Sequence, residues 1–135
     1  SLEQGQGQLS CATGGELPAF TASVTGPDPI QAQLPCDSVP SASEDLSLSW
    51  TPGSTPGASI RWEMTQNVHN AQGPRLVCET DDTGQLTVPA SLMARYVFGP
   101  DHGFALSRFV RSEVNVGTGD RVAFEALSSL LCEIH

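Results

Sequence analysis

Clusters of Gly, Pro, Asp and Asn divide the sequence into short runs of apolar and β-branched residues. Within several runs apolar and polar residues alternate, which is typical of strands with one buried face. Short strands separated by turn residues at close intervals pack as sandwiches or barrels. The pattern therefore predicts an all-β fold, and the absence of a repeat at a fixed period argues against a solenoid or a propeller.

Two neighbouring segments carry apolar residues at every second position, with a tryptophan in each. The residues on these faces are Leu46, Leu48 and Trp50 in the first segment and Ile60, Trp62 and Met64 in the second. Because side chains on one face of a strand repeat with a period of two, the two faces are predicted to pack together across a core. The alternative places Trp50 and Trp62 as sugar-stacking platforms of a carbohydrate-binding module, but the alternation favours core positions.

Further strands are expected wherever the same punctuation recurs. The runs are 17–25, 30–34, 75–80, 85–89, 103–116 and 121–127. The tetrapeptide 81–84 is predicted to close a hairpin because Asp bonds its own backbone and Gly accepts positive φ, and 117–120 is predicted to close the last hairpin. Residues 90–96 follow a proline and contain good helix formers, which predicts one short helical turn.

Residues 1–16 are rich in Gly, Gln and Ser and show no apolar periodicity. This composition predicts an extended N-terminal arm without a partner inside the chain, followed by one β-sandwich domain over 17–135. A chain of 135 residues fits a single core, since a second one would lack apolar residues.

The formal charge is −9, and all six basic residues are arginine. Six scattered arginines among fifteen carboxylates cannot form the basic face that a nucleic-acid binder or an anionic membrane surface requires. The absence of lysine also excludes Schiff-base chemistry. No apolar run is long enough to span a bilayer, so a direct membrane span is not expected.

Four dispersed cysteines, Cys11, Cys36, Cys78 and Cys132, form no C-x-x-C pair. Their even number predicts two disulfides, and of the three pairings we favour Cys11 with Cys36 and Cys78 with Cys132. Disulfides persist in oxidising compartments, so the protein is expected to be secreted, periplasmic or at the cell surface. The alternative is four free thiols in a cytosolic protein.

Residues 46–66 (LSLSWTPGSTPGASIRWEMTQ) resemble the B-to-C hairpin of fibronectin type III domains, in which a strand ending in a core tryptophan meets a Pro-Gly turn and an amphipathic strand. The continuation through 75–96 and 104–114 is similar to a pattern in secreted bacterial lipoprotein domains. This resemblance implies an immunoglobulin-like or fibronectin III-like antiparallel β-sandwich that serves as an extracytoplasmic, commonly non-enzymatic module. The chain departs from the family in its long N-terminal arm, which carries Cys11 and Cys36. The resemblance identifies no ligand.

Asp82-Thr83-Gly84 matches the tripeptide of aspartic proteases, which need two aspartates sharing a proton in an apolar cleft. The residues around it do not follow that family, because Glu79 to Asp81 stand where an apolar run belongs. A polar turn is the favoured interpretation, and hydrolysis through Asp82 is the remote alternative.

Acidic residues gather in three turns, and their oxygens are the ligand type that calcium prefers. The candidate ligands are Glu79, Asp81, Asp82, Asp101 and Asp120. No EF-hand spacing is present, so solvated turn carboxylates are the expected interpretation and no metal or other cofactor is predicted. The histidines His69, His102 and His135 are expected in exposed loops.

Together these features predict a non-enzymatic structural or interaction module, a subunit or accessory of a surface or extracellular assembly. The expected partners are proteins, including further copies of the chain joined through the arm at 1–16. The alternative function is a ligand-binding sandwich for calcium or carbohydrate.

Overall fold

The computed structural model describes residues 6–11, 20–37, 40–68, 71–96, 102–117 and 119–134. These parts of the chain are all-β apart from one helix of four residues. The elements are β1 (Gln6–Cys11), β2 (Phe20–Thr25), β3 (Leu46–Ser49), β4 (Ser59–Val68), β5 (Ala71–Asp81), β6 (Gln85–Val88), α1 (Ala90–Met93), β7 (His102–Val116) and β8 (Asp120–Ile134).

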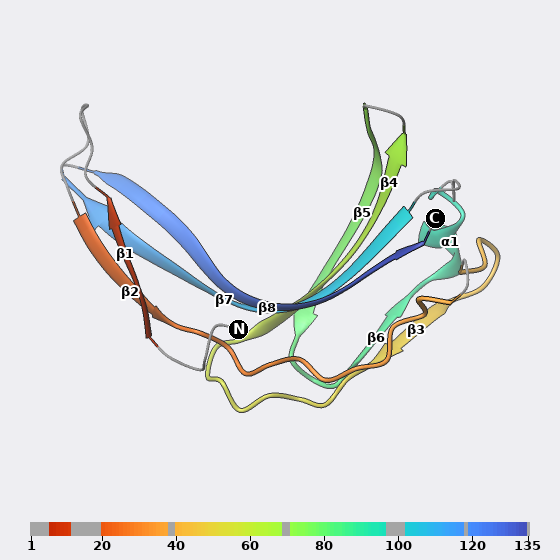
Figure 1. Ribbon diagram of the computed structural model, residues 1–135, viewed down its shortest axis with the longest axis horizontal. Coiled ribbons are helices and arrows are strands. Elements are labelled where there is room, and N and C mark those ends of the chain that lie inside the picture. Colours follow the sequence, from red (N-terminus) through yellow and green to blue (C-terminus); the bar gives the residue numbers. More distant parts are fainter. Residues whose placement is uncertain are drawn as a thin grey trace.

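The strands form three antiparallel sheets. The main sheet has four strands in the order β5-β4-β7-β8, while β3 pairs with β6 and β1 pairs with β2. Figure 1 shows β3 and β6 facing the curved main sheet on the side near α1, whereas β1 and β2 lie beside the opposite end of β7 and β8. The pair β7–β8 keeps an unbroken register from His102↔Ile134 to Val116↔Asp120, as the predicted last hairpin requires.

The core lies between the main sheet and the pair β3–β6. Its buried members are Ile30, Leu48, Trp50, Ile60, Trp62, Met64, Val88, Met93, Tyr96, Phe104 and Leu106. Of the six residues expected there from alternation, five are among them, and the sixth, Leu46, is partly buried and packs against the cluster. Trp62 stacks on Phe104 of the neighbouring strand with ring centroids 5.4 Å apart. Burial of large apolar side chains from both layers is the main force that holds the sheets together.

The short helix covers fewer residues than the segment 90–96 for which a helical turn was predicted. α1 begins at Ala90, directly after Pro89, and ends at Met93. Pro89 makes no side-chain cap, but the backbone N–H of Ala90 donates to Oδ1 of Asp45 at 2.7 Å, which satisfies one of the exposed donors at the helix start. Met93 then reaches the core.

The expected arm is partly a strand. Gln6–Cys11 pairs antiparallel with β2 over its whole length, from Gln6↔Thr25 to Cys11↔Phe20. The prediction that the arm has no partner inside the chain is therefore wrong for these residues. Polar sequences can pair when a neighbouring strand supplies the backbone groups, and apolar periodicity does not report this kind of pairing. Residues 1–5 and 12–16 of the arm lie outside the described residues.

Two connections expected to be hairpins, within 46–66 and at the turn 81–84, instead cross from one sheet to another. β3 does not pair with β4, which joins β5 and β7, and β5 does not pair with β6, which joins β3. The turn residues themselves were placed correctly, since Gly84 has φ of 96°. The strands separate because each must place its apolar face on the common core, and β3 and β6 cover that core from the side opposite to β4.

Candidate interaction surface

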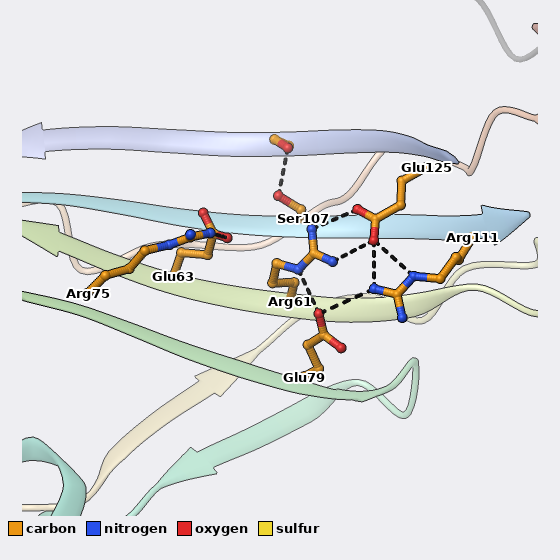
Figure 2. A network of polar contacts seen from close by, with 8 residues as sticks. Arg61, Glu63, Arg75, Glu79, Ser107, Arg111 and Glu125 are labelled. Atoms are coloured by element: carbon orange, nitrogen blue, oxygen red, sulfur yellow. Dashed lines mark hydrogen bonds and ion pairs between the residues drawn. The ribbon is translucent and has the colours of Figure 1, made fainter. Parts of the chain in front are cut away.

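The outer face of the main sheet carries a compact cluster of charges, defined here as the ionic cluster of Arg61, Glu79, Arg111 and Glu125 (Figure 2). Arg61 donates from Nη1 and Nη2 to the two oxygens of Glu125 at 2.9 and 2.8 Å, and from Nε to Glu79 at 2.8 Å. Nη2 of Arg111 donates to the same Glu125 at 2.7 Å. Two cations and two anions from four adjacent strands are thus paired on one surface.

Electrostatics within the ionic cluster follow from this pairing. The hydrogen bonds from Arg61, followed by those from Arg111, outweigh partial burial and lower the pKa of Glu125 to about 2. The same bond to Glu125 raises the pKa of Arg61. Both guanidinium groups also lie over the ring of Phe109, with Cζ atoms 4.3 and 5.5 Å from its centroid. An aromatic ring on the outer face is thereby only 4 % exposed.

Three large apolar side chains on the same outer face remain exposed. Val77, Leu127 and Leu131 are 42, 49 and 73 % accessible. Leu127 pairs across the sheet with Phe109, and Leu131 pairs with Ala105. Leu127 and Leu131, with Ser129 between them on the same face, therefore form an apolar stripe along β8, the last strand of the main sheet. Exposed apolar residues grouped on one face are a feature of docking sites.

The two edges of the main sheet differ in how they are protected. β5, at one edge, contains Gly73 and Pro74, and its pairing with β4 shifts register between Thr65 and Asn67. β8, at the other edge, has 15 residues with no Gly, Pro or register shift, and within the described residues it pairs only with β7. A long regular edge presents a row of free backbone donors and acceptors, and Pro and bulges are the devices that blunt such an edge.

Inside the domain, the predicted turn aspartate forms a buried ion pair. Nε of Arg108 donates to Oδ2 of Asp82 at 2.7 Å, and the Arg108 side chain is 1 % exposed. Asp82 also accepts hydrogen bonds from Nε1 of Trp50 at 2.7 Å and from the backbone N–H of Gly53 at 3.0 Å. Burial raises the pKa of Asp82, but these hydrogen bonds together outweigh it and hold the pKa below its ordinary value.

Every N–H of the Arg108 guanidinium has an acceptor. Nη1 donates to the carbonyls of Asp28 and Pro29 at 3.1 and 3.0 Å, and Nη2 donates to the carbonyl of Thr51 at 2.7 Å and to Asp82 at 3.4 Å. A cavity of about 300 Å³ lies beside this group. Because all five donors are already used, the cavity offers no free guanidinium donor to an anionic ligand.

These contacts bear on the hydrolase interpretation of Asp82. An aspartic protease needs a carboxylate that shares a proton with a second one. The described residues surround Asp82 instead with an arginine, an indole N–H and a backbone N–H, which all favour the ionised form. Asp82 is placed as a structural acceptor that ties the β5–β6 turn to β7.

The four calcium candidates that the structure describes are not gathered into one site by the fold. Glu79 belongs to the ionic cluster, Asp82 is bound to Arg108, Asp81 ends β5 and Asp120 begins β8. Asp101 lies outside the described residues. In the described part of the chain, no group of three or more His, Cys, Asp or Glu residues could hold a metal ion.

Two expectations about ring-bearing side chains have clear outcomes. Trp50 and Trp62 are buried, so neither indole is available as a flat platform for a sugar. His102 was expected in an exposed loop, but it is buried at the start of β7 with its ring 5.2 Å from that of Phe104. The expectation failed because the loop ends one residue earlier than the sequence indicates. His69 and His135 lie outside the described residues.

The cysteines pair differently from the favoured pattern. Cys36 and Cys132 form a disulfide with Cα atoms 5.6 Å apart, across 96 residues of sequence. Cys78 is a free, partly buried thiol opposite Trp62, and burial raises its pKa. The favoured pairing is therefore wrong, because the sheet places Cys132 on β8 and Cys78 on β5, at opposite edges. The side chain of Cys11 lies outside the description.

Sequence reasoning missed Arg108 as a structural residue. It occupies an inward position of β7, where Leu106 precedes it on the same face. A charged residue at an apolar position of an alternating strand was the available signal.

Searches against protein-family models, curated proteins and solved structures found no match to this chain. Among the described residues, no helix is long and apolar enough to cross a membrane.

Proposed function

We propose that the protein is an extracytoplasmic, non-enzymatic interaction module that acts as a subunit or accessory of a surface or extracellular assembly. The observation that carries this proposal is the unprotected edge of the main sheet at β8, with Leu127 and Leu131 exposed beside it. Strand addition at an open edge and apolar contact on the adjoining face are common means of protein recognition.

An immunoglobulin-like or fibronectin III-like sandwich is the architecture that we propose for this module. In variable-type immunoglobulin domains the strand C′ joins the sheet of C, F and G, whereas B and E lie in the opposite sheet. The order β5-β4-β7-β8, with β3–β6 on the other side of the core, agrees with that arrangement. It also agrees with the resemblance of residues 46–66 to strands B and C, because β3 and β4 lie in different sheets as B and C do.

The disulfide supports the proposed compartment. Cys36 and Cys132 join the segment before β3 to the last strand, and such bonds persist where the surroundings are oxidising. Secretion, the periplasm and the cell surface all meet this condition. Alkylation of the protein in intact cells, followed by mass spectrometry, tests it: Cys36 and Cys132 should be protected until a reductant is added.

The polar groups in the interior support a role without catalysis. Asp82 and Arg108 form the buried ion pair beside the cavity. Their polar atoms are hydrogen-bonded to each other and to the backbone. A catalytic acid or base must instead be free to exchange a proton with a substrate.

Purification of the protein from its native source, after mild cross-linking, tests the proposed function. Recovery of the chain in a defined complex with itself or another protein is the expected result. Recovery as a free monomer under the same conditions contradicts the proposal. The two results differ in mass, so native mass spectrometry distinguishes them.

A further inference from the structure

We propose that two copies of this chain associate through β8, which pairs with its own copy in antiparallel orientation about a two-fold axis at Leu127. The two main sheets then continue into each other. This inference rests on the proposed function and names the partner of that surface. The occupant is a second copy because the residues of β8 complement those of the same strand when it is reversed.

The edge itself is suited to pairing along its whole length. β8 extends over 15 residues, and its register against β7 has no break. A strand of this length spans roughly 50 Å and leaves half of its backbone N–H and C=O groups directed away from β7. The edge at β5 has Pro74 and a register shift, so it lacks this regularity.

The two-fold axis falls at the midpoint of the strand. Leu127 is the eighth of the 15 residues from Asp120 to Ile134. An axis there pairs every residue of one β8 with a residue of the other, so no part of the edge remains open. Because a two-fold contact uses one surface twice, complementarity has to exist between the two halves of this strand.

The outer face shows that complementarity. Leu127 meets Leu127 of the second copy, and Leu131 meets Ala123, so the exposed apolar stripe becomes buried. Arg121, which also pairs with Glu113 of its own copy at 3.4 Å, meets Glu133 at both ends of the strand and so adds two opposite-charge contacts across the axis, while Glu125 meets Ser129. Cross-strand pairs of these kinds stabilise a sheet, whereas like charges directly opposite each other destabilise it.

The inner face is apolar in the same register. Phe124 meets Leu130, Val122 meets Cys132, and Ala126 meets Ser128. The face that each subunit already directs toward its own interior thus continues across the axis without a charged residue until Asp120 at the end.

Neighbouring registers are less favourable. An axis at Ala126 or Ser128 brings Glu125 opposite a leucine, and an axis at Glu125 brings that carboxylate opposite itself. An axis at Ala123 pairs Arg121 with Glu125, but it matches only the first half of β8 and leaves Leu127 and Leu131 exposed. The complementarity therefore selects Leu127.

The oligomeric state of two matched variants tests this inference. Leu127→Lys places like charges opposite each other at the axis, whereas Val77→Lys changes a residue of similar exposure on the same face of β5. Sedimentation equilibrium of the full chain, up to about 1 mM to include weak association, should give a dimer for the wild type and for Val77→Lys. For Leu127→Lys the dissociation constant should rise on the order of tenfold or more, from lost burial and charge repulsion.

A charge exchange tests the register. Glu133→Arg alone should weaken the dimer because it faces Arg121 of the second copy. Arg121→Glu alone should do the same, and the double exchange should restore the wild-type dissociation constant. Misfolding cannot produce this restoration, and circular dichroism at dilute concentration checks that each variant has the wild-type strand content.

Several results overturn the inference. These are a wild-type monomer at the highest concentration, a dimer that Leu127→Lys leaves intact, disruption by Val77→Lys alone, and single charge variants that the double exchange does not restore. The proposed function fails separately, and only if the native protein also carries no other protein partner. A monomeric pure chain that is recovered natively in a complex with a different protein contradicts self-pairing but leaves the interaction module standing.

Discussion

The ion pair between Arg108 and Asp82 should be the most sensitive polar contact in the fold. Asp82→Asn keeps the shape of the side chain but removes the charge that balances a guanidinium with 1 % exposure. In the wild type each oxygen of the Asp82 carboxylate accepts hydrogen bonds from two N–H donors. In the variant an amide NH2 group replaces one of these oxygens. This group cannot accept, so two N–H donors lose their acceptor. These donors belong either to Arg108 and Gly53 or to Trp50 and Arg108, according to the orientation of the amide.

The magnitude follows from burial. Removing one partner of a buried pair costs about 3–5 kcal/mol. Arg108 keeps hydrogen bonds to three backbone carbonyls in the variant, which favours the lower end, so we predict a loss of about 3 kcal/mol in the free energy of unfolding. For a domain of this size the midpoint of thermal unfolding should fall by roughly 10 °C.

Urea denaturation followed by tryptophan fluorescence and circular dichroism provides the assay, because Trp50 contacts Asp82 directly. Asp81→Asn is the matched control, since this neighbour is exposed at the end of β5 and should change stability by less than about 0.5 kcal/mol. If Asp82→Asn and Asp81→Asn unfold at the same urea concentration as the wild type, the structural role of the buried pair is refuted.

Three other predictions concern a bond, a pH range and a glycine. Loss of the disulfide in Cys36→Ser should lower stability by about 2–5 kcal/mol in urea denaturation, as expected for a long closed loop, whereas Cys78→Ser should have a much smaller effect. The folded-state pKa of Glu125 is about 2 and its ordinary value is 4.5, so its contribution to stability should be complete above about pH 4.5 and disappear toward pH 2. Glu125→Gln should flatten this part of the curve of unfolding free energy against pH. An unchanged curve would contradict the stabilising role of the ionised Glu125. Gly53→Ala should cost about 1–3 kcal/mol in the same denaturation assay, because a Cβ there would lie 2.7 Å from the guanidinium of Arg108; wild-type stability would show that the packing is looser than described.

The elements that could be predicted from the sequence are those with a local signal. Alternation placed Leu48, Trp50, Ile60 and Trp62 on faces that the structure buries together, since a period of two depends only on strand geometry. Gly84 and the last turn were recognised because positive φ favours glycine in any context. The all-β class follows from these signals together.

What could not be predicted depends on contacts between distant segments. The turn at Asp81–Gly84 has the same local chemistry in a hairpin and in a crossing between sheets, and only the common core decides between them. The pairing of Cys36 with Cys132 likewise requires knowledge that β8 lies at the edge opposite β5. The ionic cluster has no local signal in the sequence, because its arrangement around Phe109 depends on the register of four strands.

Hydrogen exchange at individual amides of β8 tests most directly whether this edge is the interaction surface. In an antiparallel strand alternate N–H groups point toward β7, and the others point out of the sheet edge. We predict that the outward amides of β8 exchange slowly in the wild-type protein at high concentration and rapidly in Leu127→Lys, while the edge amides of β5 exchange rapidly in both. Rapid exchange of the outward β8 amides in both proteins, measured by nuclear magnetic resonance under the same conditions, would contradict self-pairing at this edge.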